Sequence, residues 1–184
     1  MSIAQVRAVI EKVKPHVFAF DPNPGSGRLN YCAPANNSEM STRYIIIDPI
    51  LRSLGWDLSD PTQCVVDNVT TSGLPDYILL NHKGEHVIVI EAKRIQEDTR
   101  CKKHIDQAAG YANSIREARV MVLTNGQYWS IEYGRAGAET ILEDGRKMPT
   151  LEGGGRALGI HWYDTEDNAQ RLHDRLWKGH YWPS

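Results

Sequence analysis

Apolar residues recur along this chain at two spacings, one typical of helices and one typical of strands. A helical period is found in four segments, at residues 2–14, 39–54, 100–117 and 165–177. Apolar or alternating runs of strand length are found at residues 64–69, 74–80, 86–93, 118–124 and 128–133. Because strands and helices alternate along most of the chain, the sequence predicts an α/β layer with a mixed sheet.

Proline, serine and glycine residues mark the expected helix ends. Pro15 is expected to end the first helix, Ser38 to cap the second helix at its amino end, and Gly55 to stop it. Pro49 lies inside the second helical pattern, so either the helix kinks there or two helices meet. The apolar face of this second pattern is expected to include Met40, Tyr44, Ile47, Ile50, Leu51 and Leu54.

Two stretches rich in glycine and proline are expected to be irregular. Residues 21–38 are expected to form a long loop, and residues 134–156 an irregular segment. Short strands are expected at 139–142 and 157–163. A chain of 184 residues is long enough for one well-buried core. We therefore expect a single domain over residues 1–184, in which residues 1–37 form an N-terminal extension of one helix and the long loop.

The composition is that of an ordinary globular protein without a strong overall charge. Hydrophobic residues make up 41% of the chain and the formal net charge is −2, which argues against a binder that depends on excess Lys and Arg. The three cysteines lack metal-ligand spacing and are expected to be free thiols in a reducing cytoplasm. No apolar run approaches the ~20 residues of a membrane span, and the N-terminus lacks a signal-peptide core.

One predicted hairpin carries the residues with the most evident chemistry. Its strands, 74–80 and 86–93, are joined by a polar turn that contains glycine. Glu91 and Lys93 are two residues apart on the second strand and therefore share a face. Asp76, at the start of the first strand, adds an acid beside them.

Two carboxylates and a lysine at one strand end suit the hydrolysis of a phosphodiester. Mg²⁺ prefers oxygen ligands, and it can activate water, neutralise phosphate charge and stabilise the leaving oxygen. Asp76, Glu91 and the backbone carbonyl of Ala92 are expected to bind this metal. Lys93 is expected to orient the attacking water or to stabilise developing negative charge. Each piece alone is also common in a turn or on a solvated face, so the prediction depends on their combination.

Pairs on two predicted helices extend the pattern. Gln107 and Tyr111 lie four residues apart on one helix and share a face, where they either support the site or pack locally. Glu39 and Arg43 have the same spacing on another helix, and they form either an exposed ion pair or part of the site. Other chemistries lack their motifs, because the chain has no histidine pair with zinc-ligand spacing and no Gly-Lys-Ser/Thr phosphate loop.

Together with Leu123-Thr124-Asn125-Gly126 and Trp129, these motifs resemble the PD-(D/E)xK nuclease superfamily. The closest resemblance is to the N-terminal nuclease domain of type I restriction endonuclease R subunits, and it runs from about Glu39 to about Leu176. Asp76, Glu91 and Lys93 match the core motif of that superfamily. Gln107 and Tyr111 match its Q-x-x-x-Y element, and Glu39 with Arg43 matches a helix that offers an acid to the same site.

The resemblance implies a restriction-endonuclease-like mixed β-sheet flanked by helices on both faces. It implies an endonuclease that hydrolyses DNA with Mg²⁺, for which Mn²⁺ can substitute. The implied catalytic residues are Asp76, Glu91, Lys93, Gln107, Tyr111 and Glu39. The expected contacts to nucleic acid are Arg43, Arg94, Lys102 and Lys103, although solvation alone also accounts for the last three.

The chain also departs from the family pattern, which leaves other functions open. Restriction R subunits carry a helicase motor after this domain, and the sequence here ends at Ser184 without Walker motifs. We therefore expect a small independent protein, which would need a homodimer or a second event to cut both strands. The alternatives are a catalytically inactive nuclease-fold module that binds nucleic acid or a protein partner, and a hydrolase acting on RNA or a small nucleotide. The aromatic residues near the C-terminus, which include Trp177, Tyr181 and Trp182, are expected to pack in the core rather than to stack on bases.

Overall fold

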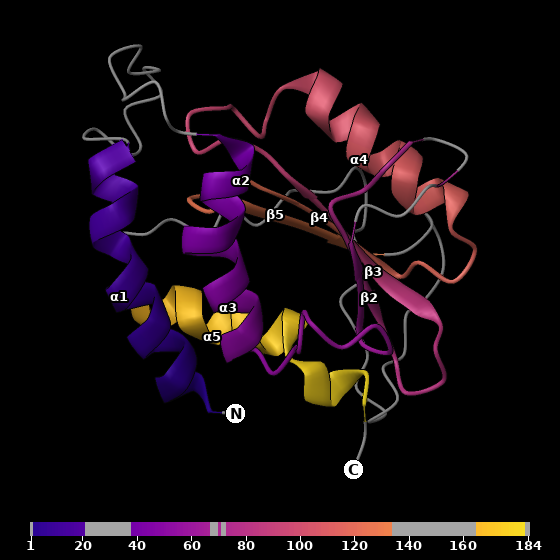
Figure 1. Ribbon diagram of the computed structural model, residues 1–184, viewed down its shortest axis with the longest axis horizontal. Coiled ribbons are helices and arrows are strands. Elements are labelled where there is room, and N and C mark those ends of the chain that lie inside the picture. The colour runs from indigo at the N-terminus through magenta and orange to yellow at the C-terminus, as the bar shows by residue number, and fades with distance from the viewer. Residues whose placement is uncertain (1, 21–37, 67–69, 71–72, 134–164, 183–184) are drawn as a thin grey trace.

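A five-stranded mixed sheet forms the centre of this α/β protein (Figure 1). The computed structural model describes residues 2–20, 38–66, 70, 73–133 and 165–182. The strands are β1 (Cys64–Val66), β2 (Tyr77–Leu80), β3 (His86–Ala92), β4 (Val120–Thr124) and β5 (Trp129–Tyr133). They lie in the order β1-β2-β3-β4-β5, with β3 and β4 parallel and the other neighbours antiparallel. The prediction of an α/β fold with a mixed sheet is therefore confirmed.

Four helices of the described chain pack against the sheet. They are α1 (Ile3–Phe20), α3 (Asp48–Ser53), α4 (Lys102–Ser114) and α5 (Thr165–Leu176). Three short segments complete the helical part: α2 (Glu39–Thr42), the π-helical turn η1 (Arg43–Ile47) and the 3-10 turn η2 (Lys178–His180). Helix α4 is the crossover between the parallel strands β3 and β4, as such a connection requires. No helix in the described part of the chain is both long and apolar enough to cross a membrane.

The strands send alternate side chains to two different apolar clusters. Ile88 and Ile90 of β3 pack in the main core, which α1, α3 and α5 supply from one face of the sheet. Val89 points to the other face and packs with Tyr111 of α4. In Figure 1, α4 accordingly lies on one side of the strands and the other three helices on the opposite side. Glu91 continues the alternation of Val89, so the candidate acid lies on the α4 face.

Helix α1 is longer than its sequence predicts. Pro15 was expected to end it, but Pro15 lies inside the helix, which continues to Phe20. Val17 extends the buried stripe formed by Val6, Ile10 and Val13, and it is only 1% exposed. Burying a valine contributes about 1.5–3 kcal/mol, which is comparable to the ~3 kcal/mol that an internal proline costs. Packing of Val17 against the core therefore offsets most of the cost of Pro15 inside the helix.

The second helical pattern runs without a break through α2, the π-helical turn η1 and α3, so its irregularity lies in a π-turn before Pro49. Ser38 caps it as predicted, because its hydroxyl accepts the Ser41 N–H at 3.0 Å. Gly55 ends it as predicted, with a φ of 100°. Met40 and Tyr44, however, are 49% and 65% exposed, so their assignment to the apolar face was wrong. The extra residue of the π-helical turn η1 rotates the preceding segment relative to α3. The buried side chains instead come from later residues of the pattern, among them Ile46, Ile47, Ile50 and Leu51.

The remaining elements follow the predictions with shifted ends. Helix α4 was expected over 100–117 and is shorter at both ends. Tyr181 is 3% exposed and Trp182 packs on the core, which confirms core packing for these two aromatic residues. The strands expected at 139–142 and 157–163, the loop expected at 21–38 and Cys32 lie outside the described residues, whereas Cys64 and Cys101 are free thiols as expected.

Candidate functional site

The open end of the β2–β3 hairpin brings Asp76, Glu91 and Lys93 together. Asp76 directly precedes β2, and the pairing of Tyr77 with Ile90 places it opposite the end of β3. One carboxylate oxygen of Asp76, Oδ2, accepts the backbone N–H of Ala92 at 2.7 Å. Lys93 Nζ donates to Glu91 Oε1 at 2.5 Å. The three charged side chains are buried, with residue exposures of 3–7%, so the predicted cluster exists in the fold.

Only one of the two carboxylate oxygens of Glu91 has a hydrogen-bond partner among the described residues. Its Oε1 is bonded to Lys93, but its Oε2 is buried with no hydrogen-bond partner among the described residues. Burial raises the pKa of Glu91 from 4.5 to about 7, and the nearby charges of Asp76 and Glu39 add to the rise while Lys93 opposes it. A buried oxygen left without a partner costs about 1–3 kcal/mol, so a cation or a proton that reached Glu91 Oε2 would be held favourably.

Lys93 remains a cation in this setting. Burial by itself would lower its pKa, but the hydrogen bond and negative charge of Glu91, with smaller effects from Glu39 and Asp76, outweigh burial and raise the pKa of Lys93 above the usual value for lysine. The backbone N–H of Lys93 donates to the Thr124 carbonyl at 2.8 Å, which extends the β3–β4 pairing by one residue. The ammonium group is therefore fixed in place and charged at neutral pH.

Arg43 lies against Asp76 rather than on an open helix face. Its Nη1 donates to Asp76 Oδ1 at 2.8 Å, and its side chain is only 11% exposed. Its Nε donates to the Tyr77 hydroxyl at 3.1 Å. The interpretation of Glu39 and Arg43 as an exposed ion pair is therefore wrong. The structure also places Arg43 in a buried contact with an acid rather than on the surface expected of a nucleic-acid contact.

Glu39 lies at the edge of the cluster, as the first residue of α2. Burial raises the pKa of Glu39, and the charge of Asp76 raises it further. Its carboxyl is also close enough to Lys93 and Glu97 to interact with their charges. The sequence-based expectation that Glu39 faces the same site thus agrees with its position, although no direct bond joins Glu39 to Glu91.

Gln107 and Tyr111 are bonded to each other on α4, and Tyr111 reaches the turn before Asp76. Gln107 Nε2 donates to the Tyr111 hydroxyl at 2.8 Å, and Tyr111 packs on the α4 face of the sheet. The Tyr111 ring also fills the space beside Gly73, where an added Cβ would lie 2.8 Å from Tyr111 Cε1. Gly73 lies three residues before Asp76. Tyr111 therefore packs against the turn that leads to Asp76.

Residues that sequence reasoning did not place in the site fix the chain after Lys93. Asn125 Nδ2 donates to the carbonyls of Ile95 and Glu97 at 3.1 and 2.9 Å. Thr42 Oγ1 accepts the Ile95 N–H at 3.2 Å. The Asn125-Gly126 pair signals a turn and is part of the family resemblance, but neither predicts that this asparagine anchors a segment thirty residues away in the sequence.

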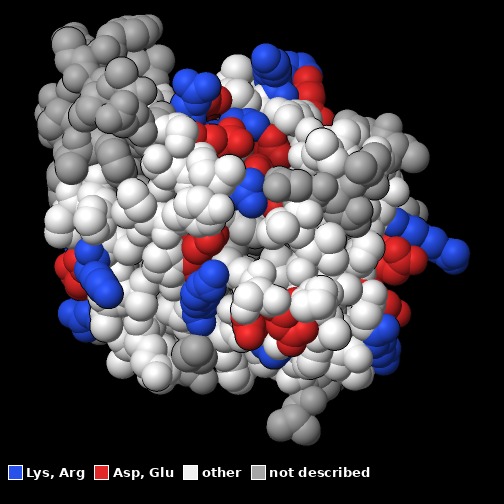
Figure 2. All heavy atoms as spheres, viewed as in Figure 1, with Lys and Arg blue, Asp and Glu red and all other residues white. Residues whose placement is uncertain are grey.

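The other three expected basic contacts, Arg94, Lys102 and Lys103, are exposed, and the first two are paired with acids. Arg94 lies 3.6 Å from Glu97, and Lys102 lies 2.6 Å from Asp106. Lys103 is also exposed. Figure 2 shows acidic and basic atoms intermingled over the region between α2 and the start of α4, without a continuous basic area on this face. The surface around the site is thus of mixed charge.

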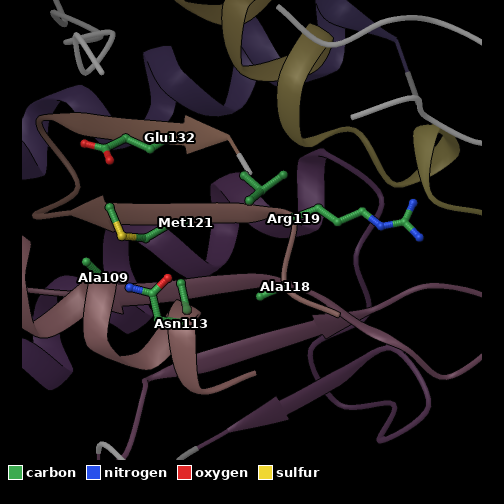
Figure 3. A pocket seen from close by; sticks show the side chains of 8 residues that line it. Ala109, Asn113, Ala118, Arg119, Met121 and Glu132 are labelled. Atoms are coloured by element: carbon green, nitrogen blue, oxygen red, sulfur yellow. The ribbon is translucent and has the colours of Figure 1, made fainter. Parts of the chain in front are cut away.

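A separate hollow of about 210 Å³ lies between α4 and the strands β4 and β5 (Figure 3). Ala109, Asn113, Met121 and Glu132 line it, and Arg119 lies at one end. Burial raises the pKa of the Glu132 carboxyl. None of the residues expected in the site lines this hollow, so it is distinct from the Asp76–Glu91–Lys93 cluster.

The donor atoms of the cluster are oxygens, which fit a hard cation such as Mg²⁺ or Mn²⁺. In the part of the chain that the structure describes, no three His, Cys, Asp or Glu residues are grouped so that they could hold a metal ion. Mg²⁺ needs no such group, since it is often bound through one or two carboxylates with water and substrate phosphate. The unpartnered Oε2 of Glu91, with Asp76 beside it, offers that kind of ligand.

Comparisons with known proteins add no family to this geometry. No protein-family model, no curated protein and no solved structure matches the chain. The function is therefore argued from the residues of the site and their contacts.

Proposed function

We propose that this protein is a Mg²⁺-dependent nuclease that hydrolyses DNA phosphodiester bonds, and that its sheet is of the restriction-endonuclease-like type. One observation carries the proposal: the carboxylate of Glu91 is buried with one oxygen unpartnered, beside the ammonium group of Lys93 and the carboxylate of Asp76. A module that only binds a partner has no evident use for like charges buried at a strand end, because their burial lowers stability.

The residues that would hold Mg²⁺ are Asp76, Glu91 and the Ala92 carbonyl, with Glu39 as a helper at the edge. When bound, Mg²⁺ polarises the phosphate, lowers the pKa of a coordinated water and offsets the charge of the leaving oxygen. The orientation of these ligands comes from the chain itself. Asp76 is held by the N–H of Ala92, and Glu91 by Lys93.

Lys93 supplies positive charge in this proposal and does not act as a base. Its raised pKa keeps the ammonium group protonated at neutral pH, so the group can donate hydrogen bonds but cannot accept a proton. Such a fixed donor stabilises the negative charge that develops on the phosphate oxygens or orients the attacking water. Gln107 and Tyr111 act through position, because they hold the turn before Asp76.

The most direct test is cleavage of supercoiled and linear DNA in the presence of Mg²⁺ or Mn²⁺. Wild type is compared with Glu91→Ala and Lys93→Ala, and Lys12→Ala provides a matched control, since it removes an exposed lysine of α1, on the opposite side of the sheet. We expect metal-dependent cutting that falls at least ~10²-fold in both site variants, as for the loss of one fixed donor in other enzymes, and that persists in the control.

Two outcomes of this assay would overturn the proposal. If folded wild-type protein cuts neither DNA nor RNA with either metal, the protein is better explained as a nuclease-fold module that binds nucleic acid or a protein partner. If it cuts RNA alone, the site is hydrolytic but its substrate is not DNA. A homodimer would allow one site to act on each strand, and the ratio of nicked to linear plasmid early in the reaction tests whether both strands are cut together.

A further inference from the structure

A chain of buried polar contacts leads from the main core to Asp76. Asp48 Oδ1 accepts a hydrogen bond from the Tyr77 hydroxyl at 2.6 Å. The Tyr77 hydroxyl in turn accepts from Arg43 Nε at 3.1 Å. Arg43 Nη1 then donates to Asp76 Oδ1 at 2.8 Å. We call Asp48, Tyr77 and Arg43 the polar relay. It joins α3, β2 and η1 to the acid of the candidate site.

The direction of the relay follows from the donors that its members possess. The arginine side chain can only donate hydrogen bonds, so the Tyr77 hydroxyl must use a lone pair to accept from Arg43. The proton of the hydroxyl is then available to Asp48 alone. Burial, followed by the charge of Asp48 and the hydrogen bond to it, raises the pKa of Tyr77 above its ordinary value, and burial also raises the pKa of Asp48. The Arg43 guanidinium lies 4.6 Å from the centre of the Tyr77 ring, which further fixes its orientation.

The π-helical turn is what allows the relay to form. The Asp48 N–H donates to the Arg43 carbonyl, so the turn η1 closes over five residues. In an α-helix, residues five apart point about 140° away from each other, since each residue turns the helix by about 100°. A hydrogen bond between residues five apart places them nearly one above the other. Arg43 and Asp48 can therefore both reach the single hydroxyl of Tyr77.

The relay crosses from one face of the sheet to the other. Tyr77 packs in the main core under α1, α3 and α5, whereas Asp76, the preceding residue, belongs to the face of Glu91. Asp76 is consequently held at both oxygens: Arg43 binds Oδ1 and the Ala92 N–H binds Oδ2. This leaves the carboxylate with a fixed orientation next to the unpartnered Oε2 of Glu91.

We propose that Arg43, Tyr77 and Asp48 are positioning residues for a divalent-cation site at Asp76 and Glu91, and that the π-helical turn is the structural device that builds them into one relay. The inference rests on the cation site of the proposed function. Partners that hold a metal-binding carboxylate or imidazole typically contribute about 10- to 100-fold to metal affinity. Arg43 also neutralises Asp76, and so allows a second carboxylate to be buried beside it.

The test measures Mg²⁺ affinity by isothermal titration calorimetry on the full chain without DNA. Tyr77→Phe removes one hydroxyl from the relay and keeps the ring, while Tyr44→Phe makes the same chemical change at a tyrosine that is 65% exposed. Arg43→Lys keeps the charge but not the planar fork of donors, and Arg52→Lys is its exposed control. We expect Mg²⁺ binding to weaken about 10- to 100-fold in Tyr77→Phe and Arg43→Lys, and to be unchanged in both controls.

Circular dichroism and thermal unfolding of the same samples show whether each variant is folded. A folded Tyr77→Phe protein and a folded Arg43→Lys protein that both bind Mg²⁺ as tightly as wild type would overturn the inference, whatever the DNA assay shows. Weakened Mg²⁺ binding in a protein whose wild type cuts no DNA would support the relay and contradict the nuclease proposal alone. Absence of Mg²⁺ binding by wild type would overturn both.

Discussion

The candidate site has two halves that differ in how completely their charges are paired. In the Asp76 half, which we define as Asp76 with the polar relay, both carboxylate oxygens of the acid are bonded. In the Glu91 half, defined as Glu91 and Lys93, one buried oxygen has no hydrogen-bond partner among the described residues. The pKa of Glu91 is displaced to about 7 by this burial. We therefore expect the fully paired Asp76 half to orient the site, and we expect a ligand to bind at the unpartnered oxygen of the Glu91 half.

The difference has an energetic meaning. Unpaired polar atoms are rare in protein interiors because each costs about 1–3 kcal/mol, and most exceptions have a specific reason. Natural proteins leave buried polar atoms unpaired mainly at functional sites. The following predictions would break or sharpen the contrast between the two halves, and they run from the largest expected effect to the smallest.

Removing the counter-charge from the Asp76 half should cost the most stability. Arg43→Met leaves the Asp76 carboxylate buried without its guanidinium, and breaking a buried pair in this way typically costs about 3–5 kcal/mol. Arg94→Met removes an arginine that is 61% exposed, and it should change stability by less than ~0.5 kcal/mol. Urea unfolding measures both. A loss below ~1 kcal/mol in Arg43→Met would show that Asp76 does not depend on Arg43.

The Glu91 half should be recognisable by the pH dependence of stability. A carboxyl whose pKa is higher in the folded than in the unfolded protein binds its proton more tightly when folded. Its contribution to stability is therefore complete below pH 4.5 and is lost as the pH rises through about 7. Glutamine in place of Glu91 does not titrate, so the free energy of unfolding of wild type should fall relative to Glu91→Gln between these pH values.

The size of that fall follows from the displaced pKa. Each pKa unit corresponds to about 1.4 kcal/mol, so the difference in unfolding free energy should change by an amount on the order of 2–3 kcal/mol between pH 4.5 and 7. Glu39 and Asp48 also have raised pKa values, but they are present in both proteins and largely cancel in the difference. Urea unfolding at several pH values measures it. If the difference in unfolding free energy between wild type and Glu91→Gln stays constant with pH, the pKa of Glu91 is the same in the folded and the unfolded protein.

The smallest effect tests whether α4 supports the Asp76 half. Gly73→Ala would place a Cβ 2.8 Å from the Tyr111 ring, whereas Gly84→Ala meets nothing within 4 Å, and both glycines have a positive φ. The backbone strain is larger at Gly73, whose φ of 130° lies outside the left-handed helical region, than at Gly84, whose φ is 76°. Both this strain and the contact with Tyr111 therefore destabilise Gly73→Ala more than Gly84→Ala. We expect Gly73→Ala to be less stable by about 1–2 kcal/mol, as for overpacking elsewhere. Equal thermal stabilities of the two variants would show that Tyr111 of α4 does not hold the turn before Asp76.

The Glu91 half was largely predictable from the sequence. The apolar strand, its alternation and the following lysine place Glu91 and Lys93 on one face without any tertiary information, and the glycine-containing turn predicts the hairpin that brings Asp76 to them. Helix α4 and the buried strand β4 followed from periodicity in the same way. A feature built by residues that are close in the sequence can thus be predicted from the local pattern alone.

The Asp76 half depends on contacts that no local pattern announces. The sequence shows Glu39 and Arg43 four apart, which suggests a surface pair, but the π-helical turn directs Arg43 to Asp76, thirty-three residues away. Pro15 was misjudged for a related reason, since the burial of Val17 against the core decides where α1 ends. Neither the extra residue of a π-turn nor the strength of distant packing can be read from spacing alone.

Binding of Mn²⁺, followed by electron paramagnetic resonance, tests most directly whether the incompletely paired half is a cation site. Wild type would be titrated at pH 8 alongside Glu91→Gln, with Glu132→Gln as the control, because Glu132 is another partly buried glutamate with a raised pKa that lies in the separate hollow. The account predicts bound Mn²⁺ in wild type and in the control, and its loss in Glu91→Gln. Equal Mn²⁺ binding by wild type and Glu91→Gln, or none by wild type, would contradict it.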